Sequence, residues 1–206
     1  MNAPRDQGTC GVSSIFAAVS VLESAWKNEY GCLYDLAEQQ VLDCGDATCD
    51  NQLCVSDVLN YALSKPIYLD QRYGAYTGEK SKCSDKPQKG SVVTTGSAFA
   101  FSTKCEEELL ANVAMGPVAA KIKTNHPSFA FYDGGIIKAA SSSDDDLTGY
   151  VAIVGYGTEG GDDYWLIKNS WGTDWGMGGY AKIARKTGGN NRGILGINLL
   201  TFLPTV

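Results

Sequence analysis

A nearly unbroken apolar segment from Ile15 to Trp26 is the feature that most constrains how this chain can fold. Its only charged residue is Glu23. Ser13 and Ser14 come just before it, and serine is a favoured residue at the start of a helix. A helix that is apolar on nearly all sides has to run through a core rather than lie on a surface. We therefore expect a buried helix close to the N-terminus.

The rest of the first half of the chain also has helical patterns, whereas the second half has strand patterns. Further helices are predicted at 36–43, 57–63 and 106–115, with an extended surface loop at 64–90. Strands are predicted at 118–122, 135–137, 150–154, 164–168 and 180–183. The acidic run at 141–146 is typical of a solvated loop. This order predicts an α+β protein with a helical lobe, a β lobe and a ligand-accessible cleft between them.

Composition narrows the classes of function. Seven cysteines in 206 residues point to an oxidising compartment, which means a secreted protein or one in a lysosomal or vacuolar lumen. Because no secretory signal is recognisable at the start, we expect that a leader was removed upstream. A net charge of -6 argues against nucleic acid or an anionic membrane surface as the main partner. No apolar run is long enough to predict membrane insertion.

Neither a metal nor a cofactor is expected. The chain has no glycine-rich loop of the kind that cradles phosphate, and no cluster with metal-ligand spacing. Cys44, Cys49 and Cys54 are spaced more widely than zinc-binding pairs, and the only histidine, His126, is far from them in the sequence.

Two segments carry a family resemblance. The stretch 7–16 (Gln-Gly-Thr-Cys-Gly-Val-Ser-Ser-Ile-Phe) and the stretch 164–176, which contains Asn-Ser-Trp-Gly, resemble two signature segments of the papain-like, cathepsin L-like cysteine proteases. Shorter matches occur at 38–44, 116–118, 131–136 and 154–157. The resemblance covers roughly residues 4–204 and implies one papain-like peptidase domain over 1–206. It implies a mainly helical lobe at 1–99 and a mainly β lobe, an antiparallel barrel, at 100–206, with a C-terminal tail that crosses back.

The resemblance also implies which positions would carry catalysis. Such a site needs a cysteine thiolate at a helix start and an imidazolium beside it. It also needs an asparagine that orients the ring and a glutamine that helps to bind the oxyanion. Alignment places Ser13 at the nucleophile position and Gly149 at the histidine position, while Gln7 and Asn169 match the two remaining groups. His126 lies in a different loop and is interpreted as a solvated side chain.

These replacements predict a catalytically inactive homologue. A serine hydroxyl needs an adjacent base to become a nucleophile, and none is present at position 149. We therefore interpret Ser13 as a cap of the helix that follows it. The alternative is residual or altered hydrolase activity, with peptides as substrates, through Ser13.

The substrate cleft of the family is altered as well. Its Cys-Asn-Gly-Gly turn reads Cys-Asp-Asn-Gln at 49–52, so side chains at Asn51 and Gln52 should crowd the path of a peptide. Trp171, which shields the Asn–His pair in the family, is retained. The positions that match the pocket for the second substrate residue are Cys54, Lys121, Leu147, Tyr150 and Leu200. The lysine and the tyrosine predict a filled or re-purposed pocket.

The resemblance assigns two disulfides to the helical lobe, Cys10–Cys49 and Cys44–Cys83. A further bridge, Cys32–Cys54, would leave Cys105 free or paired with another molecule. Spacing alone does not determine these pairings. The bridge usual in the β lobe is not expected, because Leu195 stands at one of its positions.

Three functions are compatible with the sequence. The first is a non-catalytic binding, storage or structural protein whose partner is a protein or a peptide. The second is an enzyme that works through Ser13 or another group. The third is a component of a larger assembly that uses the fold only as a surface. Cleavage of peptides would favour the second, and co-purification at fixed stoichiometry would favour the third.

Overall fold

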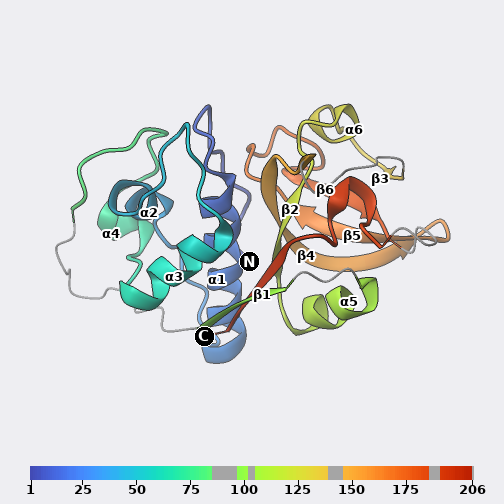
Figure 1. Ribbon diagram of the computed structural model, residues 1–206, viewed down its shortest axis with the longest axis horizontal. Helices are drawn as coiled ribbons and strands as arrows, with labels where there is room; N and C mark the ends of the chain where they lie inside the picture. Colours follow the sequence, from blue (N-terminus) through green and yellow to red (C-terminus); the bar gives the residue numbers. More distant parts are fainter. Residues whose placement is uncertain (85–96, 102–104, 139–145, 186–190, 206) are drawn as a thin grey trace.

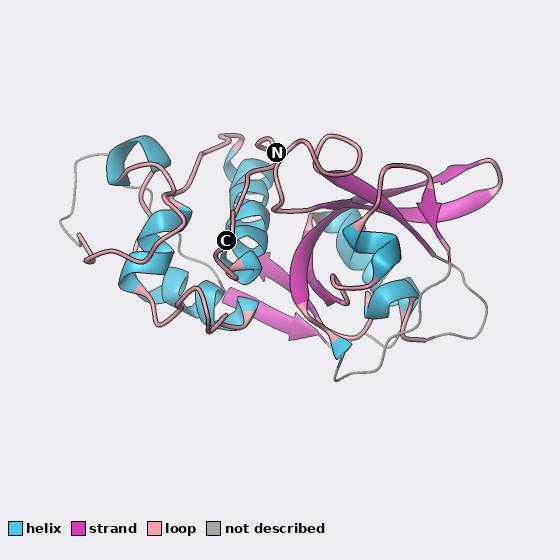
Figure 2. Cartoon of the chain, turned by 90° about the horizontal axis from the view of Figure 1, so that it is seen from above, coloured by secondary structure: helices cyan, strands magenta, loops and turns pink. Residues whose placement is uncertain are grey.

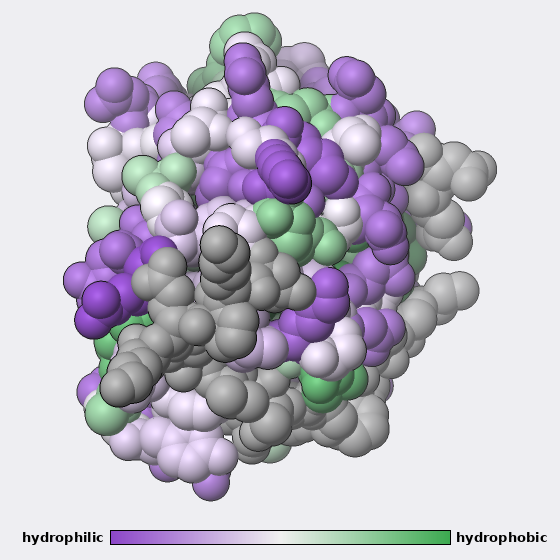
Figure 3. Space-filling view, turned by 90° about the vertical axis from the view of Figure 1, so that its left-hand side faces the viewer, coloured by the Kyte–Doolittle hydropathy of each residue, from purple (hydrophilic) through white to green (hydrophobic). Residues whose placement is uncertain are grey.

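A computed structural model of the chain describes residues 1–84, 97–101, 105–138, 146–185 and 191–205. Helices gather on one side of the molecule and most strands on the other (Figures 1 and 2). The helical lobe contains α1 (Ser13–Tyr30), α2 (Glu38–Cys44), α3 (Val55–Ser64) and α4 (Asp70–Tyr73), and the β side carries α5 (Glu106–Met115), α6 (Pro127–Ala130) and the 3-10 turn η2 (Ile194–Gly196). On the outer face of the helical lobe, hydrophilic residues surround small hydrophobic areas (Figure 3).

The buried helix that the apolar segment predicts is α1. Its residues from Ser13 to Ser24 are buried, and its last turns reach the surface. The helix ends at Gly31, which adopts a left-handed conformation with φ of 76° and donates its N–H to the carbonyl of Lys27. Glycine suits this position because it carries no Cβ.

Seven strands form one sheet. They are β1 (Ser97–Phe101), β2 (Val118–Ile122), β3 (Ile136–Ile137), β4 (Gly149–Glu159), β5 (Asp162–Lys168), β6 (Tyr180–Ala184) and β7 (Thr201–Thr205). Their order is β1-β7-β2-β4-β5-β6-β3. The pairs are antiparallel except β3–β6, which is parallel.

The β lobe is not the closed barrel that the resemblance implies. Among the described strands no pairing joins β1 to β3, so the sheet is open. The edge strand β3 is only two residues long and pairs on one side with β6, which leaves little backbone to close a barrel. Strand patterning also missed β1 and β7, which pair with each other over residues 97–101 and 201–205. The division into lobes at residue 99 stays a prediction, and β1 crosses it.

Strands β2 and β4 serve two hydrophobic cores. Side chains alternate across a strand. Accordingly Ala119, Tyr150 and Ala152 pack into the core around α1, α2 and α3. Their neighbours along the same strands pack into the core between the sheet and α5; these are Ala120, Ile122, Val151 and Ile153. The beginning of β4, at Gly149, therefore lies where the helical core and the sheet meet.

The loops are described only in part. The extended region predicted at 64–90 contains the short helix α4, and residues 85–90 of it lie outside the described residues. Most of the acidic run also lies outside them, but Asp146 is described and forms an ion pair of 3.2 Å with Lys123. Among the described residues no helix is both long enough and apolar enough to cross a membrane.

Candidate functional site

The four positions aligned with catalytic residues meet between the helical core and the sheet. Gln7 precedes α1, Ser13 begins it, Gly149 begins β4, and Asn169 follows β5. All four border one cavity of about 110 Å³. Its lining is Gln7, Gly11, Ser13, Gln52, Thr124, Thr148, Gly149, Tyr150, Asn169 and Trp171. We call the part formed by Ser13, Gln52, Gly149 and Tyr150 the cleft floor.

Both sides of the Ser13 hydroxyl are engaged. Its Oγ donates to Oε1 of Gln52 at 2.6 Å and accepts the backbone N–H of Tyr150 at 2.9 Å. The expected capping role is wrong, because the helix already begins at Ser13 and Val12 is the N-cap residue, without a side-chain cap bond. Instead the backbone N–H of Ser14 donates to Oε1 of Gln52 at 3.2 Å, so Gln52 caps the helix.

The space beside Gly149 is taken by a threonine. A Cβ added at Gly149 would lie 2.7 Å from Oγ1 and 2.8 Å from Cγ2 of Thr124, which is closer than real contacts. Thr148 holds Thr124 in turn, because the Oγ1 atoms of the two threonines lie 3.0 Å apart. A larger residue at 149 therefore requires Thr124 to move. His126 does not line the cavity; it is the N-cap of α6, and its Nδ1 bonds Ser128.

Gln7 and Asn169 have different surroundings. The Nε2 of Gln7 donates to the carbonyl of Cys10 at 2.8 Å, and its Oε1 accepts the Ser170 hydroxyl at 2.6 Å, so both ends of this amide are used. Asn169 is 4% exposed, and its Nδ2 has no hydrogen-bond partner among the described residues. Trp171 belongs to an aromatic cluster with Phe129 and Trp175, at centroid distances of 5.4 and 5.5 Å.

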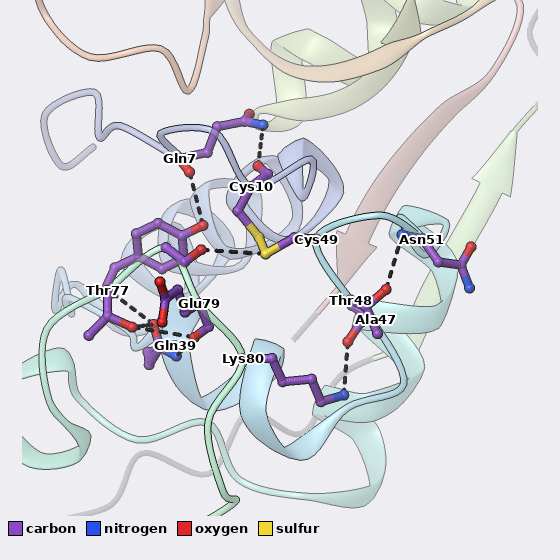
Figure 4. The surroundings of a disulfide bond; sticks show 12 residues. Gln7, Cys10, Gln39, Ala47, Thr48, Cys49, Asn51, Thr77, Glu79 and Lys80 are labelled. Carbon is purple, nitrogen blue, oxygen red and sulfur yellow. Dashed lines mark hydrogen bonds between the residues drawn. A yellow bond between two sulfur atoms is a disulfide. The ribbon is translucent and has the colours of Figure 1, made fainter.

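A disulfide holds the turn that carries Gln52. Cys10 and Cys49 form a disulfide (Figure 4). The N–H of Gly11 donates to the carbonyl of Cys49 at 3.1 Å. A Cβ at Gly11 would lie 2.8 Å from that carbonyl oxygen, so this close approach requires glycine. Asn51 is exposed and its backbone pairs with Thr48, whereas the side chain of Gln52 accepts the Ser13 hydroxyl within the cleft floor.

Tyr150 occupies the place of the expected pocket. The residue is 3% exposed, its hydroxyl donates to Sγ of Cys54 at 3.4 Å, and the Lys121 ammonium lies 5.5 Å from the ring centroid. Burial raises the pKa of the Tyr150 hydroxyl, and the bond to Cys54 acts in the same direction. The two leucines of the expected pocket, Leu147 and Leu200, are half-buried. The tyrosine ring itself therefore fills space on the helical side of β4.

Sequence reasoning missed a second polar region next to the cleft floor. We call Arg5, Glu23, Glu38 and Lys168 the charged cluster; all four line a small cavity of about 10 Å³ that Asn169 also borders. Arg5 forms an ion pair with Glu38, and Lys168 donates to the Ser20 hydroxyl at 3.1 Å. The sequence does hold one signal that could have revealed this region: Glu23 is a charged residue inside the apolar segment that forms α1.

Burial dominates the electrostatics of the charged cluster. It raises the pKa of Glu38 to about 8, although Arg5 opposes the shift. It also raises the pKa of Glu23, whose carboxylate accepts the N–H of Leu36 at 2.9 Å. Desolvation likewise lowers the pKa of Lys168. These groups face each other in the interior, so they support the fold rather than reach a ligand in the cleft.

The two disulfides that the family resemblance implies are present, Cys10–Cys49 and Cys44–Cys83. The further bridge Cys32–Cys54 is wrong, since both thiols and that of Cys105 are free. Cys32 follows the far end of α1, whereas Cys54 lies near Tyr150 beside its start. An 18-residue helix is about 27 Å long, and a disulfide needs Cα atoms within about 7 Å. No metal-ligand cluster occurs among the described residues.

Comparison with known proteins agrees with this fold. Residues 1–198 match the family described as papain family cysteine protease. Rat (Rattus norvegicus) cathepsin J is 36% identical over 88% of this chain, and the rice (Oryza sativa) cysteine endopeptidase RepA is 33% identical over 97% of it. The chain spans only 56% and 53% of these two relatives, about half of their length.

Solved structures are similar over the whole chain. The Carica candamarcensis cysteine protease CMS1MS2 in complex with E-64 has a TM-score of 0.89 and 34% identity, and the match covers 100% of this chain and 93% of that one. The bromelain protease from Ananas comosus in complex with the E64 inhibitor has a TM-score of 0.90 and 28% identity, with 100% and 94% covered.

Proposed function

The chain belongs to the papain family of cysteine proteases, and from that premise we propose that it is a catalytically inactive member. Its fold then serves binding, storage or assembly rather than peptide hydrolysis. The observation that carries the proposal is the state of Ser13. Its hydroxyl is committed to Gln52 and Tyr150, and no described side chain that lines the cavity could act as a base.

The chemistry of the family supports this interpretation of the cleft floor. A papain-like nucleophile is a thiolate stabilised by a helix N-terminus and an imidazolium. Here the helix start is occupied by the Gln52 amide oxygen, and Thr124 fills the space beside Gly149. In subtilisin, loss of the nucleophile or of the base alone lowers kcat by about 10⁶-fold. Loss of both removes the nucleophile and the base that acyl transfer by this family requires.

The test compares this protein with an active relative such as bromelain. Both are incubated at equal concentration with fluorogenic peptides and with E-64, and adducts are read by mass spectrometry. We expect no cleavage above the buffer background and no adduct, while bromelain gives both. Cleavage that a Ser13→Ala variant abolishes would overturn the proposal in favour of a hydrolase that works through Ser13.

A partner of protein or peptide nature fits the same proposal. The net charge of -6 opposes nucleic acid as a partner. The two disulfides suit a secreted or lysosomal or vacuolar lumen. Co-purification at fixed stoichiometry from the native source would identify an assembly role, and a monomer with a saturable peptide ligand would identify a binding role.

A further inference from the structure

A second cavity lies at the opposite end of α1 from the cleft floor. Its volume is about 210 Å³, against about 110 Å³ at the cleft floor, and the two cavities share no lining residue. It lies where the last turns of α1, the end of α5 and strand β7 meet. Both views of the chain place the end of β7 beside the last turn of α1 (Figures 1 and 2). We call it the α1–β7 cavity.

Most of the wall of the α1–β7 cavity is apolar. The apolar residues come from all three elements and the turn after α5; they are Ala25, Met115, Pro117, Leu203 and Pro204. Met115 is 64% exposed although it lies beside the other four. Methionine is flexible and polarisable, so its side chain can fold over a ligand of irregular shape. An apolar hollow that opens to solvent in this way is typical of an interaction surface.

The polar residues of the cavity are suited to accept hydrogen bonds from a cation. Glu29 is exposed, and it is the one ionisable residue among the described residues of the lining. Its carboxylate forms no ion pair with a described residue, because Lys27, two positions earlier on α1, donates to the carbonyl of Gly31. The Nδ2 of Asn28 donates to the carbonyl of Met115 at 3.3 Å, which leaves Oδ1 of Asn28 as an acceptor.

The end of α5 adds negative potential to the same place. Met115 is the last residue of this helix, Gly116 follows it, and both line the cavity. A helix C-terminus carries a partial negative charge of about half a unit, and α5 has no basic residue in its last turn to offset it. The net charge of the whole chain, -6, acts in the same direction. A positively charged ligand is therefore favoured.

We propose that the α1–β7 cavity binds an arginine side chain of a protein or peptide partner. Arginine joins an aliphatic stem, which matches the apolar wall, to a planar guanidinium with several donors, which matches Glu29 and Asn28. The volume is below the roughly 300–1,000 Å³ of sites for drug-sized ligands, so it suits a single side chain. The inference deepens the proposed function and rests on it only for the nature of the partner.

The first probe is n-butylguanidinium chloride, with n-butylurea as a neutral analogue of nearly the same shape. Both are titrated at constant ionic strength into the full chain, labelled with ¹⁵N and at the methionine methyl groups. We expect saturable shifts of the Met115 methyl group and the Gly116 amide, with a Kd in the roughly millimolar range that so small a ligand permits. n-Butylurea should bind about two- to fivefold more weakly, which is the contribution of an exposed ion pair. Equal binding of the two would overturn the proposal.

Matched variants separate the charge from the apolar wall. Glu29→Gln should weaken n-butylguanidinium about two- to fivefold and leave n-butylurea unchanged. Asp133→Asn is the control, because it removes the same charge from an exposed position outside the cavity. Met115→Ala should weaken both ligands about equally, since they share the butyl stem. All three positions are exposed, so the variants should stay folded. An unchanged affinity in Glu29→Gln, or an equal loss in Asp133→Asn, would contradict the proposal.

A peptide tests whether the cation belongs to a protein partner. A tripeptide with a central arginine, blocked at both ends, is compared with the same peptide carrying neutral citrulline. The arginine peptide should bind more tightly than the citrulline peptide and at least as tightly as n-butylguanidinium. Weaker binding than n-butylguanidinium would show that a peptide backbone cannot approach, and would overturn the assignment to a partner's side chain.

These measurements do not depend on turnover, so the two proposals fail separately. Peptide cleavage with intact binding of n-butylguanidinium would reject the proposed function alone. Absence of binding without any cleavage would reject the arginine site alone.

Discussion

The cleft floor and the charged cluster are adjacent polar regions that pair their polar groups in different ways. Both join α1 to the sheet, and Asn169 borders the cavities of both. The cleft floor uses neutral groups that hydrogen-bond one another, from Gln52 through Ser13 to the backbone of Tyr150. The charged cluster uses ionisable side chains, with half-buried Arg5 paired to buried Glu38 and with Lys168 near Glu23.

This difference indicates that the charged cluster stabilises the fold, whereas the cleft floor tolerates substitution. Ions in the interior are tolerated only when they are paired, so removing one member of the charged cluster damages the fold. Neutral hydrogen bonds contribute about 1 kcal/mol each, so the cleft floor can be rebuilt at modest cost in stability. The cleft floor is therefore the region where residues are free to change with function.

The largest expected effect concerns activity at the cleft floor. Ser13→Cys combined with Gly149→His should remain at least about 10²-fold below an active relative in kcat/KM, because misplacing reacting groups by about 1 Å costs that much. The new ring meets Thr124, and Gln52 covers the helix start. Fluorogenic peptide cleavage measures this.

A quadruple variant sharpens that result. Adding Thr124→Gly and Gln52→Gly makes room for the ring and for a peptide backbone, so its activity should exceed that of the double variant. Full activity in the double variant would show that Thr124 and Gln52 are not obstacles.

The next largest effect concerns the two disulfides, which close loops of equal length. Each joins cysteines 39 residues apart, so chain entropy predicts that losing either one lowers the free energy of unfolding by about 4 kcal/mol. Urea unfolding of Cys10→Ser/Cys49→Ser and Cys44→Ser/Cys83→Ser measures this. Only the first pair holds the Gln52 turn, so only it should shift the Ser13 amide signal. A shift in both variants would mean that the cleft floor is not locally fixed.

The charged cluster should make stability depend on pH. Burial raises the folded-state pKa of Glu38 to about 8, above its unfolded value near 4.5, so the folded state binds more protons between these values. The free energy of unfolding should therefore fall as the pH rises from about 5 to 8, by at most about 1.4 kcal/mol per unit. Glu38→Gln should flatten this slope in urea unfolding at several pH values. Asp162→Asn, at an exposed ion pair, is the control, and an unchanged slope in Glu38→Gln would refute the assignment.

The smallest effect concerns the bond between Tyr150 and Cys54. Tyr150→Phe removes the hydroxyl and should lower the free energy of unfolding by about 1 kcal/mol, the contribution of one hydrogen bond. It should also slow the reaction of the Cys54 thiol with a disulfide reagent, because the hydroxyl no longer donates to the sulfur and so no longer stabilises the reactive thiolate. Tyr156→Phe, at a tyrosine that is 46% exposed, should do neither. Equal effects at both tyrosines would mean that the bond contributes nothing specific.

The sequence predicts a structural element well only when the residues that determine the element are close together in the chain. The helix 106–115 and the strand 118–122 are confirmed to the residue, because periodicity and Gly116-Pro117 mark their ends. The strands β1 and β7 were missed because they pair with each other over about 100 residues, and pairing of that kind leaves no local pattern.

The same limit applies to the candidate site. Alignment located Ser13 and Gly149 at the same cavity, as the structure shows. It could not reveal that Gln52 rather than Ser13 caps α1, because the bond from the Ser14 N–H to Gln52 joins residues 38 positions apart. Nor could it reveal that Thr124 fills the space beside Gly149, because this contact depends on how β2 and β4 lie side by side.

The alternation of side chains along β4 makes the two lobes energetically inseparable. Tyr150 and Ala152 complete one core, while Val151 and Ile153 complete the other. Neither core can close without the same short stretch of backbone in place. Loss of either core thus withdraws support from its neighbour, and heat or denaturant should melt the molecule in one cooperative step.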